Sequence, residues 1–231
     1  THYLIPDVPH VSAWGLTAMV IAGAVFGLTG KVFADATHGL GGWIKKRITY
    51  APLRPLLGGV VIATAAWFMA ADRYIGLGIP TIVEAFQQPL PLYDFAAKMT
   101  FTVASLASGF KGGEVTPLFY IGATLGNALA PLLNMPFPLL AGIGFVAVFA
   151  GAANTPIAST FMAMEIFGSE VGVYAGIACV VSYLFSGHTG IYRSQRVGHA
   201  KHRHAPEGMK LGELPAYRKE QQRAADEQSK P

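Results

Sequence analysis

Charged residues are distributed very unevenly along the chain. No Lys, Arg, Asp or Glu occurs between Val115 and Met164, and none occurs between Val171 and Tyr192. A soluble core can contain one such run, whereas several apolar runs in series are typical of helices in a lipid bilayer. Only 13% of the residues are charged, against roughly 25% in soluble domains, and 27 are glycines. The sequence therefore predicts an all-α, polytopic helical membrane protein.

The apolar segments are interrupted by proline and glycine. We expect helices at about 11–43, 53–71, 95–108, 117–133, 138–153, 157–167 and 171–186. Several of these are shorter than the roughly 20 residues that span a bilayer. Broken and half-crossing helices are tolerated at membrane depth only where they line a cavity enclosed by protein, and in transporters their ends meet at the substrate site.

The polar segments set the expected boundaries. Residues 1–197 are interpreted as the membrane part, and residues 198–231 as a basic, solvated cytoplasmic tail with a short helix near its end. The Lys/Arg-rich loop at 45–54 is expected on the same side of the membrane. In the Gly- and Pro-rich linker before the third helix, Glu84 and Asp94 are expected to be exposed. Because the chain starts abruptly without Met, we expect it to be the C-terminal piece of a longer protein.

Other function classes find little support. A single cysteine, Cys179, excludes an internal disulfide and a cysteine-based metal site, and neither a metal nor a cofactor is expected. No common nucleophile, phosphate-loop, zinc-protease or dinucleotide motif occurs, so the protein is not expected to be an enzyme. The net charge of +4 comes from the tail and loops, without the aromatic residues of a nucleic-acid surface. The basic stretch 199–204 is expected to touch lipid headgroups rather than bind a metal.

The stretch 109–127, GFKGGEVTPLFYIGATLGN, is the most informative motif. Two glycines, the carboxylate of Glu114 and the hydroxyl of Thr116 lead directly into Pro117. Thr116 is a good N-cap and Pro117 suits the first helical position. Since the N-terminus of a helix offers unpaired N–H groups and a positive dipole end, the motif predicts an anion site within the membrane.

Each polar residue near this motif has an ordinary and a functional interpretation. Glu114 is either a carboxylate stabilised by the helix dipole or a protonatable group beside an anion path. Thr116 either caps its helix or donates its hydroxyl to a dehydrated anion. Tyr192 is either an interface residue or a phenol aimed at the anion from the last helix.

Three further polar residues are expected to be structural. Lys111 is expected to be solvated and His188 to be structural or solvated. Glu165 lies among apolar residues, and we expect it to pair with a polar group at a helix–helix contact rather than to carry protons.

Taken in order, these motifs resemble the CLC superfamily of anion channels and anion/proton antiporters. The resemblance covers about 11–197, corresponds to the C-terminal half of a subunit, and is carried by the glycine turn, Asn154-Thr155-Pro156, Met164-Glu165 and Gly190-Ile191-Tyr192. It implies a homodimer with one anion pathway per subunit, lined by helix N-termini and by a tyrosine, here Tyr192. The family's gating glutamate lies in the other half.

The glycine motif also indicates a branch of this family. Chloride-type members usually have G-x-F-x-P, whereas Val115 stands at the Phe position in Gly113-Glu114-Val115-Thr116-Pro117. This version resembles the bacterial fluoride/proton antiporters, which implies that Glu114 and Thr116 handle protons and fluoride. A hydroxyl and N–H groups could replace the water around this small anion.

The resemblance implies fluoride export coupled to proton import across a bacterial inner membrane. The anion-binding residues would be Gly113, Glu114, Val115, Thr116 and Tyr192, with Glu114 also coupling protons. A CLC-type chloride channel or chloride/proton exchanger, and a membrane scaffold without transport, remain as alternatives.

Overall fold

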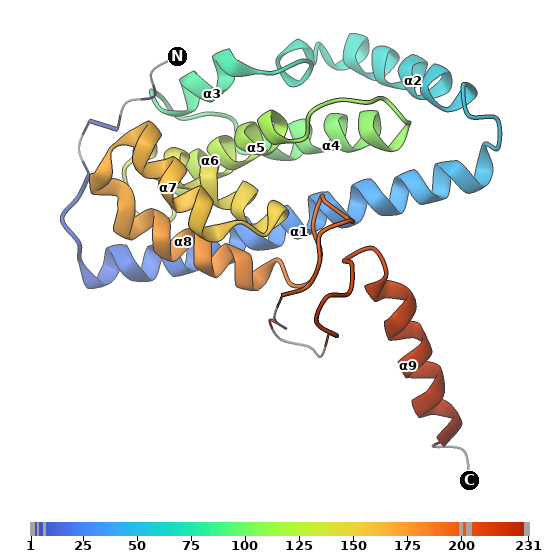
Figure 1. Cartoon of the computed structure of the whole chain (residues 1–231). Helices are drawn as coiled ribbons and strands as arrows, with labels where there is room; N and C mark the ends of the chain where they lie inside the picture. Colours follow the sequence, from blue (N-terminus) through green and yellow to red (C-terminus); the bar gives the residue numbers. More distant parts are fainter. Residues whose placement is uncertain (1–2, 4, 7, 199–200, 202–204, 229–231) are drawn as a thin grey trace.

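The computed structural model describes residues 3, 5–6, 8–198, 201 and 205–228 (Figure 1). Its helices are α1 (Ala13–Arg47), α2 (Leu53–Met69), α3 (Ile79–Ala85), α4 (Asp94–Ala107), α5 (Val115–Leu129), α6 (Phe137–Ala153), α7 (Pro156–Phe167), α8 (Gly172–Phe185) and α9 (Leu214–Gln228), with short 3-10 turns η1 (Asp72–Tyr74) and η2 (Ser169–Val171). Within the described part no β-strand forms, and one isolated bridge joins Arg196 to Lys210. The prediction of an all-α chain with short, broken helices is confirmed.

Helix α1 is the long backbone of the bundle. It begins at a serine cap, where Ser12 Oγ accepts a hydrogen bond of 3.0 Å from the Gly15 N–H, and it ends at the cations Lys45, Lys46 and Arg47. These cations suit the negative end of the helix dipole. Among the described residues, α1 is the one helix long and apolar enough to cross a membrane by length and composition, and the other apolar helices are shorter.

Helices α5 and α6 form the centre of the bundle. Figure 1 shows α4, α5 and α6 between the layer of α2 and α3 and the long helix α1. Gly122 of α5 lies against Gly144 of α6 so closely that a Cβ on either residue would overlap the carbonyl of the other. Small residues at such crossings allow two backbones to approach each other within a membrane.

The linker between α2 and α4 is not the exposed segment that the sequence suggests. Asp94 is fully buried, accepts a hydrogen bond of 2.6 Å from the Tyr74 hydroxyl, and pairs with Arg73 at 3.0 Å, so the expectation of its exposure is wrong. Glu84 is about one-third exposed and contacts the same arginine at 3.1 Å. These charges cluster because the linker folds back onto the start of α4, where each finds a partner.

The expected last membrane helix is present as α8, but the segment that follows it is irregular, so Tyr192 does not lie on a helix. The backbone of this segment pairs with another element instead of with itself. The Ile191 N–H donates to the Ala152 carbonyl at the end of α6, at 2.9 Å. Residues that pair with a neighbouring element in this way cannot also close the i to i−4 bonds of a helix. Tyr192 therefore lies on a loop held against the bundle.

The tail is partly folded onto the bundle rather than fully solvated. Val197, Ala205 and Leu214 form a small buried cluster, and α9 confirms the expected short helix. Of the basic stretch 199–204, only Lys201 lies within the described residues. Its Nζ donates to the Tyr183 carbonyl at the end of α8, at 2.7 Å, and burial lowers the pKa of this lysine to about 7.

Candidate anion site at the start of α5

The first turn of α5 presents backbone donors without intrahelical acceptors. The helix begins at Val115, Glu114 is its N-cap, and the Leu118 N–H donates to the Glu114 carbonyl at 3.2 Å. The N–H groups of Val115 and Thr116 precede this bond, so they have no acceptor in the helix. This arrangement can receive a small anion.

The prediction that Thr116 is the N-cap and Pro117 the first helical residue is wrong by two positions. Pro117 occupies the third helical position, and no side-chain bond caps the helix. Proline is acceptable there because the N–H that it lacks would have had no partner in the first turn. The hydroxyl of Thr116 is consequently not used for capping.

The glycine turn leads the chain from α4 to this helix start. Gly109 has a φ of 99°, which favours glycine, and its N–H donates to the Leu106 carbonyl at 3.1 Å as the chain leaves α4. Lys111 is exposed, as expected, and so is Gly113, around which a Cβ would meet no atom within 4 Å. Glu114 is half-buried, so its carboxylate sits where the open turn meets the packed helix.

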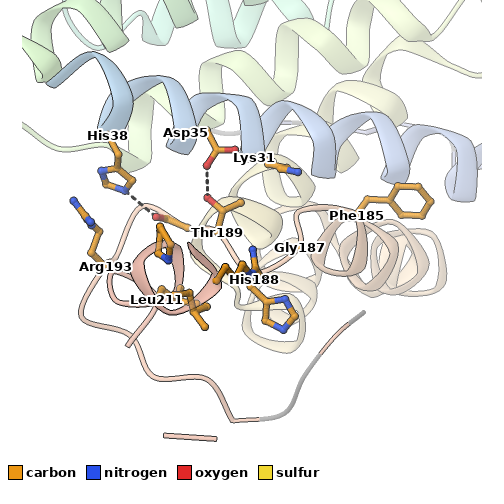
Figure 2. A pocket seen from close by; sticks show the side chains of 13 residues that line it. Lys31, Asp35, His38, Phe185, Gly187, His188, Thr189, Arg193 and Leu211 are labelled. Carbon is orange, nitrogen blue, oxygen red and sulfur yellow. Dashed lines mark hydrogen bonds between the residues drawn. The ribbon is translucent and has the colours of Figure 1, made fainter. Parts of the chain in front are cut away.

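A histidine that no local pattern in the sequence marked lies beside the segment that carries Tyr192. This residue is His38 of α1. Its Nε2 lies 3.0 Å from the Gly190 carbonyl, two residues before Tyr192 (Figure 2). The structure thus holds the tyrosine-bearing segment against α1 through this histidine. No local pattern marked His38, because its partners are far away in sequence.

Tyr192 itself has a free hydroxyl within the described chain. The side chain is 46% exposed, and among the described residues it makes no hydrogen bond, including none to Glu114 or Thr116. The structure therefore holds the segment of Tyr192 against α1 and α6, and among the described residues it shows no hydrogen bond between this tyrosine and the start of α5.

A cavity of about 460 Å³ opens beside this segment, between α1, the loop after α8 and the start of α9 (Figure 2). Lys31, His38, Arg193 and Arg218 line it, together with the carboxylate of Asp35. Basic side chains outnumber the acidic one, so the cavity favours negatively charged solutes.

Two other polar residues were assigned from sequence. Glu165 is exposed on α7 and has no hydrogen bond or ion pair among the described residues, so its expected pairing with a polar group at a helix–helix contact stays a prediction. The buried face of α7 carries Ser159 and Ala163, and a residue two positions beyond Ala163 lies on the opposite face. His188 is structural, since its Nε2 accepts a hydrogen bond of 3.0 Å from the Lys201 N–H.

The short, interrupted helices and a helix start with free donors define an all-α membrane protein with broken helices. The chain matches the family model described as voltage gated chloride channel over residues 1–187. It belongs to this family.

Individual relatives agree with this assignment. The chain is 58% identical over 233 residues to the chloride/fluoride channel protein of Pseudomonas syringae pv. tomato. This alignment covers 98% of this chain and 52% of the relative. The chain is also 30% identical over 165 residues to the voltage-gated ClC-type chloride channel ClcB of Salmonella dublin. That alignment covers 64% of this chain and 39% of the relative.

A solved structure shows the same fold. The crystal structure of a CLC-type fluoride/proton antiporter superposes with a TM-score of 0.80 at 33% identity, covering 83% of this chain and 49% of that one. The chain thus spans about half the length of the relatives that it matches most fully. The resemblance to the CLC superfamily and to its fluoride/proton antiporter branch is confirmed.

Proposed function

We propose that the protein containing this chain exports fluoride across a bacterial inner membrane in exchange for protons. The carrying observation is the start of α5, where two N–H groups without intrahelical acceptors lie beside the Thr116 hydroxyl and the Glu114 carboxylate. The names of the Pseudomonas relative and of the solved antiporter, which both include fluoride, support this choice.

The α5 start offers the donors that a small anion needs on losing its water. The N–H groups of Val115 and Thr116 and the Thr116 hydroxyl can donate to fluoride, and the helix dipole adds a favourable potential. Gly113 leaves the approach open because it has no side chain and no close neighbours. The Tyr192 phenol is proposed as a further donor, brought to the site from the loop after α8.

Glu114 is the proposed proton-coupling group. A bound anion and an ionised carboxylate in one site repel each other, so the presence of one disfavours the other. Glu114 therefore exchanges a proton as the anion binds and leaves, which links the two movements. Its half-buried position suits this role, since it faces both the open turn and the bundle.

The proposed assembly is a homodimer in the lipid bilayer, with residues 198–231 in the cytoplasm. Apolar side chains of α2 and α7, including Val61 and Phe161, are well exposed in the single chain. Such surfaces suit lipid or a second subunit rather than water.

The test is Thr116→Val in the complete protein, because valine keeps the shape of threonine and removes the hydroxyl. Proteoliposomes loaded with fluoride are followed with a fluoride electrode and a pH probe. We expect fluoride efflux to fall about tenfold, the effect of one lost hydrogen bond to a charged group. The control is Thr17→Val, an exposed threonine whose hydroxyl bonds to its own helix at the Ala13 carbonyl. Unchanged turnover and selectivity would refute the coordination role.

The same assay separates the alternatives. A relative named as a chloride channel keeps a chloride channel or exchanger open as the second candidate. Anion flux without proton movement would favour a channel, and chloride-driven proton movement would favour a chloride exchanger. Absence of any flux from the complete protein would favour a scaffold without transport.

A further inference from the structure

A second cavity lies between α2, α4 and the glycine turn that leads into α5. Its volume is about 180 Å³, well above the roughly 10–15 Å³ that one water needs, so a small anion and several waters fit inside. Gly112 and Gly113 of the glycine turn and Pro117 in the first turn of α5 form part of its wall. The cavity therefore borders on the helix start that is proposed to bind fluoride.

One face of α4 supplies a row of polar side chains to this cavity. Lys98, Thr102 and Ser105 all line it, and their spacing of four and three residues places them on the same side of the helix. Ser105 Oγ donates to the Phe101 carbonyl at 2.8 Å, whereas the Thr102 hydroxyl makes no hydrogen bond among the described residues. The row runs from Lys98 toward the end of α4, after which the glycine turn begins.

Lys98 is buried at the wall of the cavity. Its side chain is only 1% exposed, and its Nζ donates to the carbonyls of Tyr74 and Gly76 at 3.0 and 2.6 Å. Tyr74 and Gly76 also line the cavity, so the ammonium group lies at its edge. Because an ammonium group carries three N–H donors, one donor remains for a ligand.

No carboxylate forms an ion pair with Lys98 in the part of the chain that the structure describes. Asp94, one turn earlier on α4, is held by Arg73 at 3.0 Å and by the Tyr74 hydroxyl at 2.6 Å. The two charged residues that line the cavity are both basic, Lys98 and Lys111. A cation away from bulk water attracts an anion more strongly than a solvated one does, so the cavity favours a small negative solute.

We propose that this cavity is a second anion site, in which Lys98 and the Thr102 hydroxyl hold the transported anion beside the start of α5. Side chains one turn apart on a helix have Cβ atoms about 5–6 Å apart, so both groups can contact the same small monovalent ion. Their N–H and O–H donors replace part of its water. The site raises the concentration of the anion next to α5, and this proposal rests on the proposed function of that helix start.

The first test removes one hydroxyl from the complete protein. In proteoliposomes, Thr102→Val should raise the fluoride concentration for half-maximal efflux about fivefold, the effect of one hydrogen bond, and leave the maximal rate and the protons moved per fluoride unchanged. Thr100→Val is the matched control on the same helix, because this exposed hydroxyl donates to the Ala96 carbonyl at 2.8 Å. An unchanged half-maximal concentration in Thr102→Val would overturn the proposal, as would a loss of maximal rate alone.

The second test removes the charge. Lys98→Gln keeps an amide donor for one of the two carbonyls, and we expect it to raise the half-maximal concentration about tenfold, as for a lost hydrogen bond to a charged group. Lys46→Gln, at an exposed lysine of α1, is the control and should match the parent. Parental affinity in a folded Lys98→Gln would overturn the proposal. If this variant aggregates in size-exclusion chromatography, Thr102→Val decides alone, since its hydroxyl bonds to no other described group.

Failure of the proposed function is distinguishable from failure of the second site. If the complete parent protein carries chloride instead of fluoride, or moves no protons, fluoride/proton exchange is wrong. The same variants are then compared with the anion that the parent carries, because the second site is scored on half-maximal concentrations and not on proton movement. A parent that carries neither anion would overturn both proposals.

Discussion

The buried charges Asp94 and Lys98 are each stabilised by their own hydrogen bonds or ion pair. Asp94 has no exposed surface and is held by Arg73 and Tyr74. Lys98, only 1% exposed, donates to the carbonyls of Tyr74 and Gly76 at 3.0 and 2.6 Å. A buried charge persists only when partners replace its water, so each of these contacts is needed to keep the linker against α4.

The first prediction concerns the ion pair of this cluster. Arg73→Leu leaves the Asp94 carboxylate buried without its cation, and we expect the free energy of unfolding to fall by about 3 kcal/mol. Unfolding of the purified protein in detergent, followed by circular dichroism, measures this loss. Lys46→Leu, at an exposed cation on α1, is the control and should change stability little. Equal stability of both variants would contradict the assignment.

At the level of elements, α6 is packed on nearly all sides. Nearly every residue between Leu139 and Ala153 is buried, so α6 has no exposed face to place in water or lipid. Its contact with α5 depends on glycines one turn apart, since a Cβ at Gly122 or Gly126 would overlap a carbonyl of α6. The close crossing holds α5 against α6, and the start of α5, with its free donors, lies half-buried where the open turn meets the bundle.

The second prediction tests this crossing. Gly122→Val puts a branched side chain into the Gly144 carbonyl, and we expect a loss of about 3 kcal/mol or more because both backbones must shift. Gly39→Val is the matched control, since a Cβ at this helical glycine meets no atom within 4 Å. The temperature at which the monodisperse peak disappears in size-exclusion chromatography reports the difference. If the crossing tolerates valine, the monodisperse peak of both variants will disappear at the same temperature, which would contradict the prediction.

The outer surface of the bundle carries large apolar side chains on α2. Trp67 and Phe68 of α2 are 84% and 82% exposed, and neighbouring Met69 is 65% exposed. An apolar surface of this kind would promote aggregation in water. It is compatible with lipid, where the side chains need no polar partners.

The third prediction follows from this surface. In a variant of the complete protein with Trp67 as its only tryptophan, brominated acyl chains should quench the fluorescence strongly. A variant that retains only Trp14, whose Nε1 donates to the Leu133 carbonyl at 2.9 Å, should be quenched less. Efficient quenching of Trp14 with none of Trp67 would show that another surface, rather than lipid, covers α2.

Local sequence was sufficient for the class of protein and for most helices. Apolar runs without charge predict membrane helices wherever they occur, and proline and asparagine end α6 and start α7 close to the expected residues. The glycine turn and the residues 113–117 also identified the family, because these features depend on neighbours in the chain. The start of α5 was misplaced by two residues, since a proline is acceptable anywhere in a first helical turn.

Contacts between distant segments decided the rest. Hydropathy placed Asp94 in an exposed linker, but its partner Arg73 lies 21 positions away and the fold buries the pair. Tyr192 was expected on a helix, whereas pairing of Ile191 with the end of α6 makes its segment a loop. His38 and Gly190 are 152 positions apart, and no local pattern could bring them together. The hydrophobic pattern of the sequence shows which residues avoid water. Which polar residues pair with each other depends on which segments the fold brings together.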